Sequence, residues 1–344
     1  MTHAPLRIGI YGSGSIGTFI GAHCFQAGLD TILVGREKLG QEIQAHGLRI
    51  TDLKGTDFRL SPSQVRYATS AAAMSDREIV LMTLKSAATA QAAEELKPVL
   101  SSDAIVVSFQ NGVRNAEVLR GILTHNPVLA GMVPYNVVWK PGAHFHSGTS
   151  GALAIEDQGD ASAKVLAALK AAGLEAEVKP NLQNVLWGKL VFNLNNALNA
   201  LSGIPLREEL GQAAYRKILA AAMREAMRVM KQSGIKPARS GGLIPQIAPL
   251  VMSLPDFLFF RVASRMVKID PQARSSMWED LQRGRQTEID FLNGEIVALA
   301  ERNGLRAPIN AAITRLVKEA EKTKSAPKMS ADELAGRMKN EETI

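Results

Sequence analysis

Residues 6–17 read LRIGIYGSGSIG, and this stretch decides the fold. A short apolar run over residues 6–11 leads directly into the G-x-G-x-x-G pattern of Gly12 to Gly17. Residues 16–28 then have the composition of a helix that Gly28 stops. A strand, a glycine turn and a helix in this order are typical of the first β-α-β unit of a dinucleotide-binding domain.

Each part of this glycine loop has an expected role in binding a dinucleotide. Gly12 permits the tight turn, Gly14 lets the backbone approach a pyrophosphate, and Gly17 lets the helix pack closely on the strand. Backbone N–H groups at the start of the helix then face the phosphates. We therefore predict that the whole loop binds the cofactor, through Gly12, Ser13, Gly14, Ser15, Ile16 and Gly17. The alternative is a glycine turn without a ligand, which this sequence context disfavours.

The end of the next apolar run, residues 31–34, bears on the choice of cofactor. An NAD site usually places an acidic residue about 20 residues after the glycine loop, where it binds the ribose 2′-hydroxyl. Here Gly35 takes that place and Arg36 follows it. Because a guanidinium group suits a 2′-phosphate, we predict NADPH (NADP) as the cofactor, bound through Arg36. Glu37 keeps NAD open as an alternative, and a solvated loop charge is the other interpretation of Arg36.

The alternation of short apolar runs with helix-like segments continues to about residue 180. Further apolar runs occupy residues 78–84, 104–109, 128–133 and 152–155. They predict an α/β, Rossmann-type doubly wound domain over residues 1–180. Beyond it no convincing strand pattern occurs, and helical periodicity covers residues 182–201, 208–233, 276–303 and 308–322. We expect an all-α domain over residues 181–325 and a charged C-terminal tail over 326–344 that frays.

Composition limits the class of protein. With 344 residues, 46% of them hydrophobic and 21% charged, the chain has enough apolar material for two cores. A net charge of +7 and an aromatic content of 5% suit a small anionic ligand better than nucleic acid. The single cysteine, Cys24, predicts a cytoplasmic protein, and no apolar run approaches the ~20 residues that span a membrane. No metal is expected, because the histidines show no ligand spacing beyond His144 and His146, which we place in an exposed loop.

A stripe of polar residues interrupts the apolar face of the helix predicted over 182–201. The stripe begins with Leu182 and continues at helical spacing through Lys189, Asn193 and Asn196. Burying a charge and two amides costs free energy unless a ligand or an internal network satisfies them. A lysine in such surroundings should have a lowered pKa and could act as an acid near neutral pH. The alternative is a lysine that extends to solvent beside structural asparagines.

Five motifs together resemble one family over essentially the whole chain. They are Gly12 to Gly17; Thr83-Leu84-Lys85; Gln110-Asn111-Gly112; Trp187-Gly188-Lys189 with Asn193; and Ser275-Ser276-Met277 continuing through Arg285 to Gly294. The chain thereby resembles the ketopantoate reductase (2-dehydropantoate 2-reductase) family, the last motif being the most specific. The resemblance implies a Rossmann domain and a helical domain with the active site between them. It also implies NADPH-dependent reduction of a 2-keto acid, with ketopantoate as the leading substrate and pantoate, a precursor of pantothenate and coenzyme A, as the product.

The resemblance also implies roles for individual residues of the helical domain. Lys189 would be the general acid that protonates the carbonyl oxygen, and Asn193 would orient the substrate and the lysine. Glu288 and Ser276 would contact the substrate. Because Glu288 would repel a carboxylate, we assign it to the substrate hydroxyl or to Lys189, and we expect Ser276 with Asn196 to bind the carboxylate.

In the first domain, the resemblance places Lys85 and Asn111 beside the nicotinamide and the ribose. Asn111 also suits that place on physical grounds, because it ends a strand and precedes a helix, at the edge of the sheet where ligands bind. Capping of strand ends is the alternative interpretation of both residues.

Two features depart from a simple transfer of the family's pattern. The family usually has a second asparagine eight residues after the lysine, where this chain has Ala197, so Asn196 would have to replace it with altered geometry. On one straight helix, Ser276 and Glu288 would lie about 18 Å apart, too far for one small substrate to reach both. We therefore expect either that Ser276 lies in a turn that folds back before the helix, or that one of the two residues does not contact the substrate. The chain also has an additional segment, 254–275, whose role stays open.

The sequence leaves three functions open. The first is the NADPH-dependent 2-keto acid reductase, the second is a related hydroxy-acid dehydrogenase with a different substrate, and the third is a binding protein that senses NADP without turnover. Retention of Lys189 and Glu288 disfavours the third. The partner predicted for the chain is a small 2-keto acid, without nucleic acid or membrane, and the resemblance is compatible with a homodimer.

Overall fold

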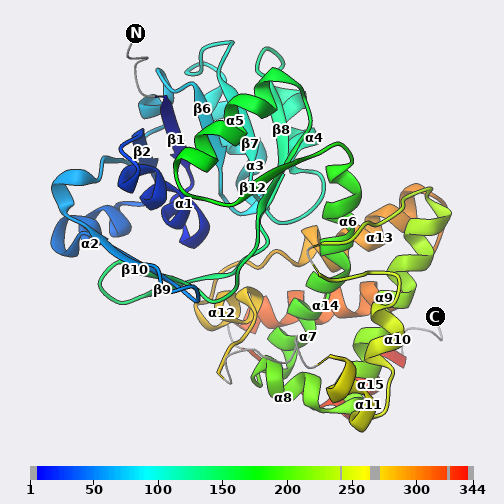
Figure 1. Cartoon of the computed structure of the whole chain (residues 1–344). Helices are drawn as coiled ribbons and strands as arrows, with labels where there is room; N and C mark the ends of the chain where they lie inside the picture. The colour runs from blue at the N-terminus through cyan, green and yellow to red at the C-terminus, as the bar shows by residue number, and fades with distance from the viewer. Residues whose placement is uncertain (1–5, 241, 264–271, 324–325, 340–344) are drawn as a thin grey trace. The chain divides into compact units, whose positions relative to one another are not determined.

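The glycine loop follows a central strand of an eight-stranded sheet with the order β12-β11-β8-β7-β6-β1-β2-β5. The strands along this order are β12 (Ala176–Lys179), β11 (Leu153–Glu156), β8 (Val128–Met132), β7 (Ile105–Ser108), β6 (Ile79–Met82), β1 (Arg7–Tyr11), β2 (Asp30–Val34) and β5 (Tyr67–Ala68). Neighbouring strands from β5 to β8 are all parallel, and β11 is antiparallel to β8. The apolar runs of the sequence therefore form the predicted doubly wound sheet (Figure 1).

The structure is a computed structural model that describes residues 6–240, 242–263, 272–323 and 326–339. The chain divides into two compact units, Met1–Gln183 and Asn184–Ile344. No helix in the described ranges is long and apolar enough to cross a membrane.

Helices cover the eight-stranded sheet. They are α1 (Ser15–Gln26), α2 (Glu37–His46), α3 (Thr89–Leu96), α4 (Asn115–Ile122) and α5 (Asp160–Ala171), with short 3-10 turns η1 (Pro62–Gln64), η2 (Ala71–Met74) and η3 (Ser86–Ala88). Helix α3 packs beside α4, and α5 packs on β11 and β12. Helix α1 packs against β2 and also against a second sheet, so it lies in the middle of the first unit's core.

The second sheet has four strands and was not predicted from the sequence. Its order is β4 (Asp57–Leu60), β3 (Leu48–Asp52), β10 (His144–Ser147) and β9 (Val137–Lys140). The expectation of an exposed loop for His144 and His146 is therefore wrong. Both histidines lie on β10, and their ring nitrogens hydrogen-bond the Thr51 hydroxyl at 2.8 and 2.7 Å. The strand was missed because β10 pairs with β3, which is far away in sequence.

Strand order explains how the first unit brings its candidate residues to one edge. β1 pairs with β2 on one side and with β6 on the other, so the direction of the chain across the sheet reverses at β1. Ligands of doubly wound sheets bind at the carboxyl ends of the strands beside such a reversal. The glycine loop follows β1, Arg36 follows β2, Lys85 follows β6 and Asn111 follows β7.

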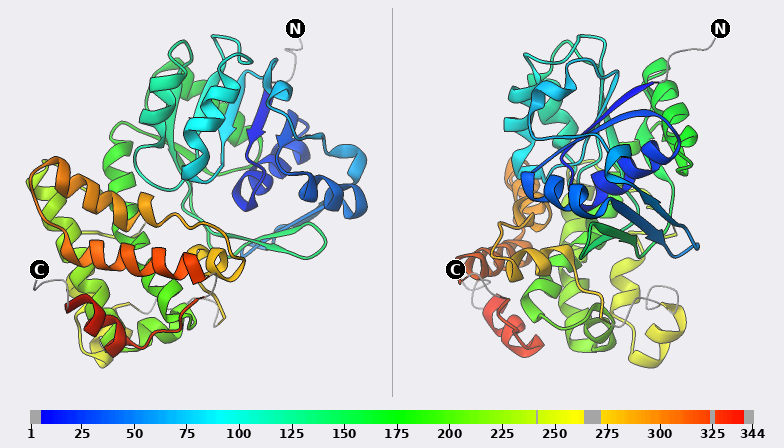
Figure 2. Two further views of the ribbon diagram at one scale, coloured as in Figure 1. Left: turned by 180° about the vertical axis from the view of Figure 1, so that it is seen from behind. Right: turned by 90° about the vertical axis from the view of Figure 1, so that its left-hand side faces the viewer.

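The second unit is helical, as predicted. Its elements are α6 (Leu182–Asn193), which begins at the end of the first unit, α7 (Asn195–Ser202), α8 (Leu206–Gly211), α9 (Ala213–Gln232), α10 (Ala248–Met252), α11 (Asp256–Val262), α12 (Ser276–Gln282), η4 (Ile289–Phe291), α13 (Asn293–Arg302), α14 (Pro308–Thr323) and α15 (Ala331–Lys339). The long helix α9 packs against α10, α13, α14 and α15, while α13 and α14 run side by side (Figure 2). Strand-like pairing among its described residues is limited to one bridge between Ser240 and Leu243.

Three predicted helices are interrupted. The segment 182–201 breaks after Asn193, and 208–233 consists of α8 and α9. The segment 276–303 is α12, η4 and α13, because Gly284 adopts a φ of +60° and ends the α12 region. Ser276 and Glu288 therefore do not share one straight helix, and the 18 Å spacing expected from it does not apply.

Part of the segment predicted as a fraying tail is ordered. Helix α15 packs on α9 and α14, and the side chain of Leu334 is fully buried. The N–H of Met329 also donates to the carbonyl of Leu201 at 2.9 Å. The apolar residues of this segment outweigh its charges because they pack against a long helix, which the sequence alone does not show.

Candidate active site

The glycine loop is fixed to the end of β2. The N–H groups of Gly12 and Ser13 both donate to the carbonyl of Val34 at 2.9 Å, and the Ser13 hydroxyl donates to the same oxygen at 3.0 Å. Gly12 has a φ of +108°, and a Cβ atom there would lie 2.6 Å from the backbone nitrogen of Leu84. Only glycine therefore fits this turn.

The other two glycines of the loop face different surroundings. A Cβ atom on Gly17 would overlap the Thr83 hydroxyl and lie 2.8 Å from the carbonyl oxygen of Gly12. A Cβ atom on Gly14 would meet only that same oxygen, at 4.0 Å. Gly17 thus serves close packing of the helix on the strand, whereas Gly14 borders open space that a side chain would fill.

The start of α1 is suited to an anion. Gly14 is the N-cap residue, so no side chain caps this helix, and its first turn holds no acidic residue. The first backbone N–H groups of a helix lack partners within the helix and carry a partial positive charge. The open space beside Gly14 and these donors together fit the pyrophosphate of a dinucleotide.

Arg36 lies exposed at the start of α2. Its backbone carbonyl accepts hydrogen bonds from the Tyr67 hydroxyl at 2.7 Å and from the Leu39 N–H at 3.1 Å. Its guanidinium group makes no hydrogen bond or ion pair within the described residues, so it is available to an anion. The neighbouring Glu37 accepts a hydrogen bond from Gln41 at 3.3 Å.

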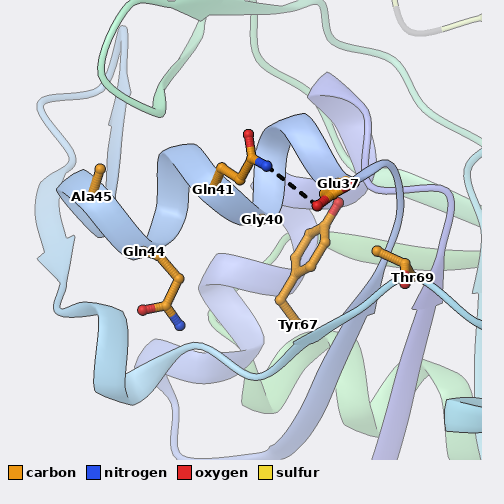
Figure 3. Close-up of a pocket in the computed structure, with 7 residues that line it drawn as sticks. All are labelled: Glu37, Gly40, Gln41, Gln44, Ala45, Tyr67 and Thr69. Atoms are coloured by element: carbon orange, nitrogen blue, oxygen red, sulfur yellow. Dashed lines mark hydrogen bonds between the residues drawn. The ribbon is translucent and has the colours of Figure 1, made fainter.

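A pocket of about 520 Å³ borders the same region. It is lined by Glu37, Gly40, Gln41, Gln44, Ala45, Tyr67 and Thr69. Figure 3 shows the Tyr67 ring standing against α2, with the Gln41–Glu37 hydrogen bond on the helix above it. Gly40 makes room for that ring, since a Cβ atom there would lie 2.9 Å from it.

A buried polar network supports the loops that carry Lys85 and Asn111. The Ser86 hydroxyl and the Asn115 amide both donate to the carbonyl of Asn111, at 2.7 and 2.5 Å. The network continues through Thr89 and Gln110, whose amide donates to the carbonyl of Leu84 at 3.1 Å. Of these supporting residues only Gln110 stood in a motif quoted from the sequence, and Ser86, Thr89 and Asn115 were not singled out. The pattern that could have found them is the group of polar side chains directly after two buried strands.

In the second unit, Lys189 lies on α6 and is partly buried. Burial lowers the pKa of its ammonium group to about 8, and the nearby Glu288 carboxylate opposes that shift. The predicted direction of the lysine pKa is therefore confirmed. The interaction also brings Lys189 and Glu288 together, although they are far apart in sequence. Gly188 lets α6 pack against the backbone of Ala238, with which a Cβ atom would overlap.

Ser275 and Ser276, at the start of α12, differ in their burial. Ser275 is buried, and its hydroxyl accepts a hydrogen bond from the Trp278 N–H at 3.2 Å and donates to the carbonyl of Asn196 at 3.0 Å. Ser276 is exposed at the first position of the helix. The contact with Asn196 joins α7 to α12, so Ser276 lies next to a residue bonded to the other predicted carboxylate ligand.

Asn193 and Asn196 lie at the junction of α6 and α7, and both are partly exposed. Ala197, where the family usually has asparagine, is fully buried. Within the described residues no group of three or more His, Cys, Asp or Glu side chains is arranged to hold a metal ion.

Comparison with known proteins decides the family. The model for "Ketopantoate reductase PanE/ApbA" matches residues 8–160, and the model for its C-terminal domain matches residues 181–321. The chain belongs to the ketopantoate reductase family. The fold class and the resemblance stated from the sequence are thus confirmed.

Individual members of the ketopantoate reductase family match nearly the whole chain. A PanE/ApbA family ketopantoate reductase from Ralstonia eutropha JMP134 has a TM-score of 0.79 and 30% identity, covering 93% of this chain and 99% of that one. The 2-dehydropantoate 2-reductase of Archaeoglobus fulgidus is 29% identical, covering 92% of this chain and 98% of that protein. D-mandelate dehydrogenase, solved with NADH and anilino(oxo)acetate, has a similar fold, with a TM-score of 0.77, 20% identity, and coverage of 93% and 99%.

Proposed function

We propose that this protein is an NADPH-dependent reductase of a 2-keto acid, and that the substrate is 2-dehydropantoate, reduced to (R)-pantoate for pantothenate and coenzyme A synthesis. The observation that carries the proposal is the pKa of about 8 for Lys189, beside Glu288, in a chain of the ketopantoate reductase family. An amine with that pKa holds a proton near neutral pH and releases it readily. The relatives named 2-dehydropantoate 2-reductase support the choice of substrate.

The first unit supplies the cofactor site in this proposal. The open space at Gly14 and the uncapped start of α1 fit the pyrophosphate, and the exposed guanidinium group of Arg36 fits a 2′-phosphate. Lys85 and Asn111 would bind the nicotinamide end, on loops that the buried network holds in place. The bound nicotinamide supplies a hydride to the carbonyl carbon of the substrate.

In this proposal, residues of the second unit donate the proton and bind the substrate. Lys189 gives its proton to the carbonyl oxygen, and Glu288 favours the charged lysine before that transfer. Asn193 orients the substrate from the end of α6. Ser276 and Asn196 bind the substrate carboxylate, because both are neutral donors and Ser275 is already engaged in the cap of α12.

A second candidate is reduction of a different 2-keto acid by the same chemistry. The observation that favours it is Ala197, which is fully buried where the family usually has asparagine. Asn196 starts from a position rotated by about 100° on the helix, so the shape of the substrate site would differ.

The assembly and location are also part of the proposal. We propose a homodimer, since a ketopantoate reductase of similar fold from Staphylococcus aureus, with a TM-score of 0.69 and 16% identity, is described as dimeric. The single cysteine, buried Cys24, favours the cytoplasm. Light scattering after size-exclusion chromatography would give the mass of the assembly, and a monomer at micromolar concentration would contradict the dimer.

Steady-state kinetics test the function. NADPH oxidation is followed with 2-dehydropantoate, pyruvate, phenylglyoxylate and the amide of 2-dehydropantoate. We expect the highest kcat/KM with 2-dehydropantoate and a large loss with the amide. Preference for another 2-keto acid selects the second candidate. NADPH binding without turnover of any of these compounds would leave a cofactor-sensing protein and overturn the reductase.

A further inference from the structure

One face of the four-stranded sheet carries a row of basic residues that the proposed reaction does not use. Arg59 on β4 lies opposite Arg49 on β3. Arg49 lies beside His144 on β10, and His144 lies opposite Lys140 on β9. The next residue of β10, Phe145, points to the other face and is fully buried. Each strand therefore contributes one basic side chain, at the same level, to the face that is turned away from the core.

The charges of this row are only partly compensated. Like charges directly opposite each other destabilise a sheet. The nearby Asp57 on β4 accepts two hydrogen bonds from the Arg49 guanidinium group, at 3.1 and 2.7 Å, and so uses both of its oxygens. Arg59 and Lys140 form no hydrogen bond or ion pair with any residue that the structure describes. The row therefore keeps an excess of positive charge that an anion would balance.

The pKa of His144 reflects this excess. Burial lowers the pKa of its imidazole ring. Three neighbouring positive charges lower it further, those of Arg49, Lys140 and His146, while the Asp57 carboxylate opposes them. A bound anion would reverse the effect of these charges on the ring.

These residues border a pocket of about 290 Å³. Its walls come from the end of α2, from the sheet and from the turn between β9 and β10. The residues that line it are His46, Arg49, Arg59, Pro141, Gly142 and His144. Among these described residues four are basic and none is acidic. A concave surface with charge of one sign concentrates ions of the opposite sign.

The ring of His144 and the turn beside it are held in place. The Thr51 hydroxyl hydrogen-bonds the Nε2 atom of His144 at 2.8 Å, and the Nδ1 atom of this ring has no hydrogen-bond partner in the described part of the chain. In the turn, Ala143 is fully buried and adopts a φ of +47°, which is unfavourable for alanine. Its carbonyl accepts the Arg49 N–H at 3.1 Å. Strained backbone of this kind clusters at ligand-binding sites.

The pocket is separate from the proposed site of the cofactor 2′-phosphate. Arg36 precedes the first residue of α2, and His46 is the last residue of that helix. At 1.5 Å per residue, the two ends of α2 lie about 15 Å apart. The larger pocket beside Tyr67 also shares no lining residue with this one. A phosphate held by Arg36 therefore lies outside the basic pocket.

The basic groups and the volume of the pocket indicate a class of ligand. Guanidinium groups suit the oxygens of a phosphate, and an imidazolium ring can donate one more hydrogen bond. Ligand pockets usually measure ~300–1,000 Å³, so this one has room for a small molecule rather than a second dinucleotide. We propose that Arg49, Arg59 and His144 form a second anion site, which binds a small phosphate compound at the same time as the cofactor. This site does not depend on the proposed function.

Calorimetric titration of the whole protein with saturating NADPH tests the site. Inorganic phosphate and glycerol 3-phosphate are the two ligands, and glycerol is the uncharged control. We expect binding of a phosphate compound and none of glycerol, and the tighter of the two ligands shows whether the phosphate is free or carried by a small molecule. Arg59→Gln should weaken this binding roughly tenfold or more, since it removes charge-assisted hydrogen bonds. The Kd of NADPH should stay within about twofold, because its site is distant.

A matched control separates the pocket from the net charge of the protein. Arg207→Gln removes the same charge from an exposed position on α8 and should bind phosphate like the wild type. Failure of the wild type to bind either phosphate compound at millimolar concentration would overturn the proposal. Equal loss of binding in Arg59→Gln and Arg207→Gln would also overturn it, as would binding of a short DNA duplex under conditions where neither phosphate compound binds.

A second readout needs only the wild-type protein and one variant for assignment. Histidine NMR spectra give the pKa of His144, and His144→Gln identifies its resonance. Bound phosphate should raise this pKa, because the added negative charge favours the imidazolium form. A pKa of His144 that is the same with and without phosphate would overturn the proposal, even if Arg59→Gln fails to fold.

Discussion

At the scale of single residues, burial lowers the pKa of Lys189 and so suits it to proton transfer. Its pKa of about 8 means that the ammonium form predominates below that pH. Because reduction consumes this proton, we expect kcat for reduction to be constant below about pH 8 and to fall as the pH rises through it. The reverse oxidation needs the free amine and should gain rate over the same range. A pH profile of kcat in both directions checks the assignment.

Removal of the amine gives a second check on the same residue. Lys189→Met should lower kcat by ~10²–10⁴-fold, the usual range for a general acid, and leave NADPH affinity unchanged. Lys179→Met is the matched control, because Lys179 forms a surface ion pair with Glu177 on the edge strand β12. If Lys189→Met keeps most of its activity, the lysine is only a structural residue.

Arg36 should decide between NADPH and NADH. A charge-assisted contact with the 2′-phosphate is worth ~1.5–3 kcal/mol, so Arg36→Ala should weaken NADPH binding roughly 10- to 100-fold. NADH affinity should hardly change, and the exposed neighbour Glu37→Gln serves as the control. The measurement is the Kd of each cofactor by fluorescence titration. Equal weakening of NADPH and NADH binding would indicate that Arg36 is only a solvated surface charge.

The residue types of these positions were readable from the sequence, but their partners were not. Lysine at position 189 falls on a recognisable helical stripe, and its lowered pKa followed from the expectation of burial. The buried residues Glu209 and Asn199 carry no such pattern. Their hydrogen bonds form only because α7, α8 and the start of α12 pack together.

At the scale of elements, the glycine loop gives a matched pair of substitutions. Gly17→Ala should destabilise the protein by about 1–3 kcal/mol, since the new methyl group would overlap the Thr83 hydroxyl and crowd the carbonyl of Gly12. Gly14→Ala should leave stability nearly unchanged, because only one atom lies as close as 4.0 Å. It should nevertheless weaken NADPH binding strongly, since the methyl group fills the space assigned to the pyrophosphate.

Thermal unfolding and cofactor titration of the two variants check this expectation. Loss of stability in Gly14→Ala, or unchanged NADPH affinity in it, would contradict the assignment of the open space to the cofactor.

Element boundaries show where sequence periodicity stops being informative. Residues 276–303 keep an approximate helical pattern, yet Gly284 at a φ of +60° and the turn around it divide the segment. One glycine in a helical pattern is a weak indicator, because many glycines are tolerated inside helices. The break was decided by the contacts of α12 with α7 and of α13 with α14.

At the scale of the whole molecule, the two units have separate internal contacts. All residues proposed to bind the cofactor belong to the first unit. We therefore expect residues 1–183, produced alone, to unfold cooperatively and to bind NADPH within about tenfold of the full chain. Addition of NADPH at about 100 times its Kd should stabilise this fragment by about 2.7 kcal/mol.

Denaturant unfolding with and without NADPH measures both expectations. A fragment that folds but does not respond to NADPH would show that the second unit contributes to the cofactor site. The fragment should have no reductase activity in either case, since it lacks Lys189.

The sequence by itself determined the glycine loop, the parallel sheet that follows it, the helical second half and the family. These features depend on local patterns: strand-like apolar runs, glycines at fixed spacing, and motifs of a few residues. Only the tertiary structure decided the second sheet, the ordered helix α15 and the interrupted helices. It also decided the two hydrogen bonds by which Asn199 links Glu209 to Ser275. Each of these depends on which distant segments meet, as β3 meets β10, and a contact between distant segments leaves no periodic trace in either of them.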